Sequence, residues 1–177
     1  MIDAFNPSQT PSYAFTPPLN PSPNMRTFLA YLKALNTWDY DECMAVFDDS
    51  LEHWILPKSL GRPVLNKKQY GEYFKVLMPT FSGIEFSIQD IIETADKMTV
   101  HASSKGTSTL GTPYNNEYIL ILHFTSPLIA TPSSEASGEW TPKIKLLKEF
   151  VDSAVSIKFF TEDRAKITVK EREKEKA

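Results

Sequence analysis

Residues 114–125 of the chain read YNNEYILILHFT, and this stretch decides the fold class. Successive side chains of a β-strand point to opposite faces, and the run from Tyr118 to Leu122 is apolar at every position. Both faces of this strand must therefore be covered. Helices can cover one face, and we expect the sheet to curl around a cavity on the other.

On both sides of this stretch, apolar and polar residues alternate with a period of two. Turn signals occur at Asp96-Lys97 and Gly111-Thr112-Pro113. This pattern predicts three further strands, over residues 84–94, 97–109 and 143–157. The connection between the last two strands, residues 126–142, holds three prolines and is much longer than a hairpin requires. We expect a surface loop there, either decorative or acting as a lid.

Amphipathic helices precede these strands. Apolar residues recur at helical spacing over residues 25–35, with Asn24 as the expected N-cap. Asp39 can cap a second short helix, residues 51–56 form a first strand, and a third helix begins after Asn66. Helices followed by a meander of strands predict the α+β class.

The length and composition indicate one domain. A chain of 177 residues with 12% aromatic residues is long enough for a single aromatic-rich core, which we place in residues 25–162. Residues 1–24 contain six of the thirteen prolines and are expected to form a mobile or draped arm. Residues 163–177 are expected to form a charged tail, either a solvated helix extension or a frayed end.

Several kinds of partner are disfavoured by the sequence. A net charge of -3 provides no positive field that attracts phosphate backbones, so we do not expect the protein to bind nucleic acid. The single cysteine, Cys43, cannot form an intramolecular disulfide and fits a buried apolar position. The chain shows neither a secretory start nor an apolar run of about 20 residues, the length of a membrane span. We therefore expect a soluble cytoplasmic protein that does not insert into a membrane.

The histidines give no sign of a metal site. His53, His101 and His123 lie on three different predicted strands, without the spacing of metal-binding pairs. The chain also lacks the GxSxG, P-loop and GxGxxG motifs, so neither a hydrolase elbow nor a nucleotide site is predicted. General acid–base chemistry is what the sequence leaves open.

The last predicted strand contains a break in its period of two. Ile144 and Leu146 share one parity, yet Leu147 follows directly. Such a break is typical of a β-bulge, which re-aims side chains next to active sites. A carboxylate that faces an apolar cavity is desolvated and can take or give a proton near neutral pH, so Glu149 is the best candidate for a general base. The alternative is an exposed glutamate paired with Lys148 or Lys145.

Other polar residues are candidates for contacts to a ligand. His53 and Trp54 face opposite sides of the first strand. His53 can protonate a carbonyl or stabilise an enolate opposite Glu149, and its alternative is a hydrogen-bonded structural role. Asn116 and Tyr118 share a parity and can orient a ligand oxygen, although Tyr118 also fits a plain core position.

Two further candidates lie nearer the ends of their strands. Asp152 comes three residues after Glu149, which gives it the opposite parity in a regular strand, and it can also cap a helix or pair with a basic group. His101 shares a parity with Ser103 and Thr107. This polar stripe either lines a pocket or faces solvent.

Three local segments resemble a known family. They read LPKSLGRP at residues 56–63, YNNEY at residues 114–118 and EFVDS at residues 149–153. Together with the order of helices and strands, they are similar to the SnoaL-like branch of the nuclear transport factor 2-like superfamily. The resemblance covers roughly residues 25–162 and implies a cone-shaped barrel, in which a curved, mostly antiparallel sheet wraps around three N-terminal helices. As aligned, some members of that branch carry an arginine where His53 stands.

Fungal members of this branch include isomerases and cyclases of polyketide, meroterpenoid and indole-alkaloid intermediates. The resemblance therefore implies an acid–base enzyme of secondary metabolism without a cofactor, with Glu149 as base and His53 or Tyr118 as donor to the oxyanion. The alternative is a non-catalytic module that binds a small hydrophobic molecule or dimerises. A pocket of about 300 Å³ or more that touches Glu149 favours the enzyme, and a solid core favours the module. Relatives usually dimerise through the outer face of the sheet, so we expect a homodimer.

Overall fold

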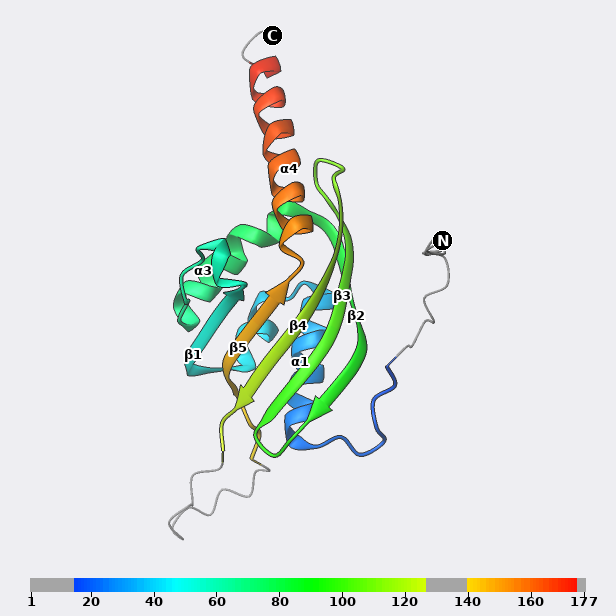
Figure 1. Ribbon diagram of the computed structural model, residues 1–177, viewed down its shortest axis with the longest axis vertical. Helices are drawn as coiled ribbons and strands as arrows, with labels where there is room; N and C mark the ends of the chain where they lie inside the picture. The colour runs from blue at the N-terminus through cyan, green and yellow to red at the C-terminus, as the bar shows by residue number, and fades with distance from the viewer. Residues whose placement is uncertain (1–14, 127–139, 175–177) are drawn as a thin grey trace, which may run out of the picture.

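The computed structural model describes residues 15–126 and 140–174 of the chain. Four α-helices, two short 3-10 helices and five strands lie in this part of the chain (Figure 1). In chain order they are α1 (Pro23–Thr37), α2 (Tyr40–Ala45), β1 (Phe47–Leu56), η1 (Lys58–Leu60), α3 (Lys67–Leu77), η2 (Met78–Thr80), β2 (Phe81–Glu93), β3 (Lys97–Ser108), β4 (Pro113–Phe124), β5 (Ile144–Val151) and α4 (Ser153–Lys174).

One curved sheet forms the body of the molecule, with the strand order β1-β5-β4-β3-β2. β1 runs parallel to β5, and the other neighbouring strands are antiparallel. The α1 helix lies against the concave face, and α4 extends beyond one end of the sheet (Figure 1). The predicted α+β class and the curved, mostly antiparallel sheet are therefore confirmed. The sheet stays open between β1 and β2 instead of closing into a barrel.

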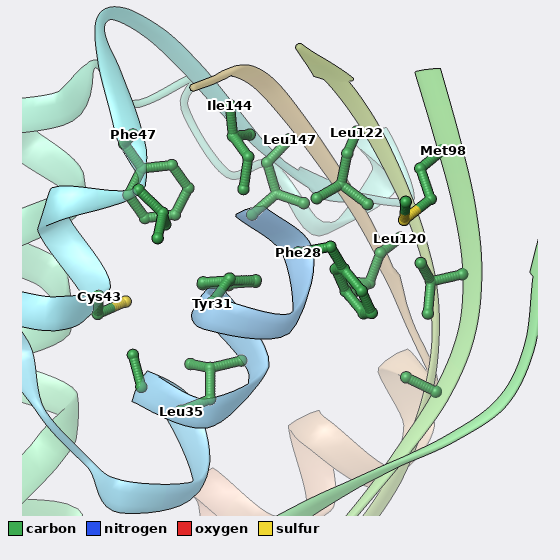
Figure 2. Packing of buried hydrophobic residues seen from close by; sticks show 14 of the residues in the cluster. Phe28, Tyr31, Leu35, Cys43, Phe47, Met98, Leu120, Leu122, Ile144 and Leu147 are labelled. Atoms are coloured by element: carbon green, nitrogen blue, oxygen red, sulfur yellow. The ribbon is translucent and has the colours of Figure 1, made fainter. Parts of the chain in front are cut away.

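The main hydrophobic core lies between α1 and the concave face of the sheet. Phe28 and Tyr31 of α1 are buried there together with Leu122 of β4 and Leu147 of β5 (Figure 2). Alternate residues of β4 point outward, and one of them, Ile119, is 39% exposed. The expectation that both faces of β4 are covered is therefore wrong for the single chain. The helices and the concave core both lie on one side, and the described chain adds no layer on the other.

Side-chain caps fix the starts of the first three helices. The Ser22 hydroxyl accepts the backbone N–H of Met25 at 2.9 Å, so Ser22 caps α1 instead of Asn24. The side-chain amide of Asn24 donates to a backbone carbonyl in the turn between β2 and β3. Asp39 caps α2, as predicted, and α3 begins after Asn66, as predicted, with Asn66 as its cap. Cys43 of α2 is fully buried, and burial raises the pKa of its thiol to about 12.

The last strand is shorter than predicted, and a fourth helix takes its place. β5 ends at Val151 instead of residue 157, and α4 begins at Ser153. Oδ1 of Asp152 accepts the backbone N–H groups of Ala154 and Val155 at 3.0 and 3.3 Å. These bonds satisfy donors that a helix start leaves unpaired. The first strand also differs, because β1 begins before residue 51, at an irregular stretch in its pairing with β5.

A buried polar cluster ties α4 to the turn between β3 and β4. Oδ1 of Asp163 accepts hydrogen bonds from the hydroxyls of Ser108 and Thr112 at 2.6 and 2.8 Å. The ammonium group of Lys166 donates to the Thr112 hydroxyl at 2.9 Å. Because Asp163 is only 7% exposed, its charge depends on these donors. The cluster therefore fixes α4 at the end of the sheet.

Two expectations fall wholly or partly outside the described residues. They are the first part of the proline-rich arm, residues 1–14, and most of the possible lid, residues 127–139. Of the arm, Phe15 lies beside β2, where its backbone N–H donates to the carbonyl of Ile88. Among the helices in the described ranges, none combines the length and the hydropathy needed to cross a bilayer.

Candidate active site

A cavity of about 250 Å³ lies between the helices and the concave face of the sheet. Side chains of α1, α3 and the sheet line it, and α4 contributes part of its rim. Five tyrosines are among the lining residues: Tyr31, Tyr70, Tyr73, Tyr114 and Tyr118. Glu149 is the only carboxylate among the lining residues that the structure describes. The interior beside Glu149 is therefore hollow, although its volume lies below the roughly 300 Å³ taken to favour an enzyme.

His53 and Glu149 form a hydrogen-bonded pair at the wall of this cavity. Nε2 of His53 lies 3.1 Å from Oε2 of Glu149. The His53 side chain is 1% exposed and packs against the ring of Tyr70, whereas that of Glu149 is 25% exposed and lines the cavity. An ionised carboxylate can only accept, so Nε2 of His53 carries the proton. The buried His53 thus positions Glu149 by a hydrogen bond, and Glu149 lines the cavity.

The position of Glu149 follows from plain alternation in β5. The ladder with β4 keeps its register from Leu146 to Val151, and it shifts between Ile144 and Leu146. Leu147, Glu149 and Val151 therefore share the inward face. The break in periodicity is real, but the bulge lies at the start of β5 and does not re-aim Glu149.

The tyrosines of the cavity keep their protons well above neutral pH. Burial raises the pKa of each of the five phenols, and the nearby charge of Glu149 raises it further. A neutral phenol is a hydrogen-bond donor. The cavity therefore surrounds one carboxylate with several O–H groups, an arrangement that can take a proton and stabilise the resulting oxyanion.

Asn116 and Tyr118 face the same side of the sheet as the cavity, but their polar atoms are bonded within the protein. The Tyr118 hydroxyl donates to that of Tyr114 at 3.0 Å and lies 2.9 Å from the hydroxyl of Ser104. The amide of Asn116 donates to the hydroxyls of Tyr114 and Ser156 at 2.7 and 2.8 Å. The sequence did not single out Tyr114, the residue at which these bonds meet.

Three of the predicted site residues do not line the cavity. The indole N–H of Trp54 donates to Glu52 at 3.3 Å, and two lysine ammonium groups lie over its ring. His101 lies on the outer face of the sheet, where Nε2 meets Oε1 of Glu117 at 2.5 Å. Asp152 caps α4. The polar stripe that includes His101 therefore faces solvent.

Two arginines at the rim were missed by the sequence analysis. Arg62 follows η1, Arg164 belongs to α4, and both are exposed residues of the cavity lining. Arg62 had a signal, because it lies in the LPKSLGRP segment that carries the family resemblance. Arg164 had none, because its segment read as a charged tail.

No group of three His, Cys, Asp or Glu side chains suited to a metal ion occurs among the described residues. The expectation that the protein works without a metal or another cofactor stays a prediction.

The chain is similar to known fungal proteins in sequence and in fold. A family model described as "SnoaL-like domain" matches residues 28–131. Monooxygenase AacuO of Aspergillus aculeatus is 31% identical over 101 residues, which is 56% of this chain and 62% of AacuO, less than two thirds of its length. Monooxygenase AgnL5 of Paecilomyces divaricatus is 28% identical over 130 residues, 72% of each chain. Among solved structures, BvnE pinacolase from Penicillium brevicompactum has a TM-score of 0.66 at 22% identity, covering 82% of this chain and 96% of BvnE.

Proposed function

The chain belongs to the SnoaL-like domain family, and we propose that it is a cofactor-independent acid–base isomerase or cyclase of fungal secondary metabolism. The observation that carries the proposal is the position of Glu149, a carboxylate at the wall of an aromatic-rich cavity and bonded to a buried imidazole. The substrate is a small hydrophobic intermediate of polyketide, meroterpenoid or alkaloid type. Its rings pack against the tyrosines of the cavity.

Glu149 acts as the general base. It takes a proton from a carbon next to a carbonyl, and a phenol O–H stabilises the enolate that forms. In an isomerisation, Glu149 returns the proton to a different carbon of the enolate. In a cyclisation, the enolate carbon attacks an electrophilic carbon of the same molecule, and Glu149 gives its proton to the oxygen that becomes negative there. Neither reaction gains or loses electrons, so neither needs a redox cofactor.

The names of the two sequence relatives favour a second candidate, a monooxygenase. Glu149 would remove a proton from an activated CH₂ group, and the carbanion would react with O₂. The CH₂ group becomes a carbonyl and one water molecule is released. The substrate itself supplies the electrons, so this reaction also balances without a cofactor.

A non-catalytic binding module of the same fold is the alternative. The observation in its favour is the cavity volume of about 250 Å³, which is small for a drug-sized ligand at the usual minimum of roughly 300 Å³.

One experiment separates these functions. Deletion of the gene in its source organism, followed by mass spectrometry, identifies the compound that accumulates. Purified protein is then incubated with this compound in air without added cofactor. An isomerase or cyclase gives a product of unchanged mass and a new retention time. A product with one oxygen more and two hydrogens fewer would identify the monooxygenase, and binding without any product would contradict the enzyme and support the module.

A further inference from the structure

The hydroxyls of Tyr114 and Tyr118 both belong to the cavity lining, but their protons are used differently. The Tyr118 hydroxyl has one proton, and it donates that proton to the oxygen of Tyr114. The hydroxyl of Ser104, 2.9 Å from that of Tyr118, must then be the donor in their bond. A chain of donation therefore runs from Ser104 through Tyr118 to Tyr114.

Asn116 completes the arrangement around Tyr114. Its two amide protons go to the hydroxyls of Tyr114 and Ser156, and its carbonyl oxygen accepts the backbone N–H of Glu117. Asn116 has no proton left for a ligand. The oxygen of Tyr114 accepts from both Asn116 and Tyr118, and Tyr114 also has a side-chain hydrogen bond with Ser156, so neither Asn116 nor Tyr118 takes up its own proton.

We propose that Tyr114 is the catalytic residue that donates a hydrogen bond to the oxyanion, with Tyr118 and Asn116 as its positioning residues. The inference rests on the proposed function, and it replaces His53 or Tyr118, the two donors that the family resemblance implied. Each bond that Tyr114 accepts polarises its O–H group and strengthens the bond that it donates. Tyr114 is 7% exposed, so this donation takes place largely out of water.

A phenolate that binds but does not react tests this donor without any turnover. The probe is 4-nitrophenolate, and the protein carries Glu149→Gln, which mimics the protonated base and removes its repulsion of an anion. Adding Tyr114→Phe should weaken binding about 10-fold or more, as expected for the loss of a hydrogen bond to a charged group. Adding Tyr118→Phe should weaken phenolate binding by about 3-fold or less, because this substitution removes only the hydrogen bond that Tyr118 donates to Tyr114 and leaves the Tyr114 donor in place.

The neutral compound 4-nitrotoluene serves as the control, since it should bind all three proteins equally if the cavity stays intact. A loss in Tyr118→Phe that equals or exceeds the loss in Tyr114→Phe would overturn the proposal. So would failure of the Glu149→Gln protein to prefer the phenolate over 4-nitrotoluene. Because no product is measured, the assignment of Tyr114 and the proposed enzyme activity can fail separately.

A second and independent observation concerns the charge at the rim of the cavity. Neither Arg62 nor Arg164 has an ion pair or a side-chain hydrogen bond with any residue that the structure describes. Other basic side chains are paired, such as Lys33 with Glu42. The charge of Arg62 reaches into the cavity, because it opposes the rise that burial causes in the pKa of Tyr73.

We infer that these two guanidinium groups bind a carboxylate at one end of an aromatic substrate. A carboxylate cannot lie beside Glu149, because two negative charges repel each other there. It is drawn instead to the rim, where guanidinium groups match its geometry. The uncharged end of the substrate then lies against the tyrosines next to Glu149. This inference rests on the cavity being the substrate site of the proposed function.

The test compares 2-naphthoate with its neutral counterpart 2-naphthamide in equilibrium binding. The wild type should prefer 2-naphthoate about 10-fold, the size of one charge-assisted pair. Arg62→Gln and Arg164→Gln should each lose most of this preference without weaker binding of 2-naphthamide. Arg172→Gln is the matched control, because it removes the same charge from α4 about 12 Å further along the helix.

The inference would be overturned if the wild type bound 2-naphthoate and 2-naphthamide with equal affinity. It would also be overturned if the preference for 2-naphthoate persisted in both Arg62→Gln and Arg164→Gln. Failure of the wild type to bind either compound would overturn it too. A normal preference in a protein without turnover would leave the carboxylate site in place and contradict only the proposed enzyme.

Discussion

Nε2 of His53 lies 3.1 Å from Oε2 of Glu149, although the two residues are 96 positions apart in the chain. The parallel pairing of β1 with β5 brings them together, since it places His53 opposite Leu147 and Ile55 opposite Glu149. Nδ1 of His53 has no hydrogen-bond partner among the described residues. The imidazole therefore has one hydrogen-bond partner among the described residues, the carboxylate of Glu149, which lines the cavity.

The first prediction concerns the base. Glu149→Gln keeps the volume of the side chain but removes its ability to accept a proton. Turnover of the accumulated compound should fall by about 10²–10⁴-fold, the usual effect of losing a general base. The melting temperature, measured by differential scanning calorimetry, should change little. Unchanged turnover would remove Glu149 from the mechanism.

The second prediction concerns the buried pair. His53→Phe keeps a ring against Tyr70 but leaves Glu149 without its donor, so the free energy of unfolding in urea should fall by about 1–3 kcal/mol. When the protein already carries Glu149→Gln, His53→Phe should cost less free energy of unfolding. The double-mutant cycle of these two substitutions gives the interaction energy between His53 and Glu149. His101→Phe is the matched control, because the outer His101–Glu117 pair is exposed and should contribute about 0–1 kcal/mol. Equal losses at both histidines would contradict the structural difference between the pairs.

The third prediction concerns the attachment of α4. Asp163→Ala leaves the hydroxyls of Ser108 and Thr112 without their buried acceptor, and stability should fall by about 1–3 kcal/mol. Glu162→Ala is the control on the neighbouring exposed position, where the change should stay within about 0.5 kcal/mol. Urea unfolding measures both. Hydrogen exchange should also show faster opening of α4 in the Asp163 variant, and unchanged exchange would argue against the attachment.

The fourth prediction concerns alkaline pH. The five cavity tyrosines have pKa values raised above the ordinary value of 10.0, mainly by burial. Above pH 10.0 the unfolded chain releases these protons and the folded chain keeps them, so stability should decrease as the pH rises. Absorbance of the tyrosinate ion should show these five phenols ionising together with unfolding followed by circular dichroism. Ionisation of all tyrosines before any unfolding would contradict the buried environment.

The fifth prediction concerns association. Ile119 and Phe150 are cross-strand neighbours on the outer face of the sheet, and they are 39% and 43% exposed. We propose that a second copy covers this apolar surface, so light scattering should give about twice the chain mass of 20.1 kDa. Ile119→Lys should yield single chains, and Ile167→Lys on α4 should not. A wild type that stays at the mass of one chain at micromolar concentration would contradict the dimer.

Local sequence patterns predicted the fold class, the cap at Asp39, a helix that begins after Asn66, and the shared parity of Asn116 and Tyr118. These features depend on local patterns: a cap needs a partner three residues away, and alternation fixes which side chains share a face. The same local rules failed at the end of β5, where the apolar spacing after Asp152 fits either a strand or a helix.

Which side chains come into contact depends on the packing of distant segments. Parity placed Glu149 on one face of its strand, but the parallel neighbour β1 placed His53 beside it. Tyr114 became the centre of a hydrogen-bond network because β3, β4 and α4 converge there, and Arg164 reached the rim because α4 is a helix anchored by Asp163. Periodicity fixes the direction of a side chain relative to its own element. Contacts between distant segments depend on which strands become neighbours and how the elements pack, and the pattern of a single segment does not specify these.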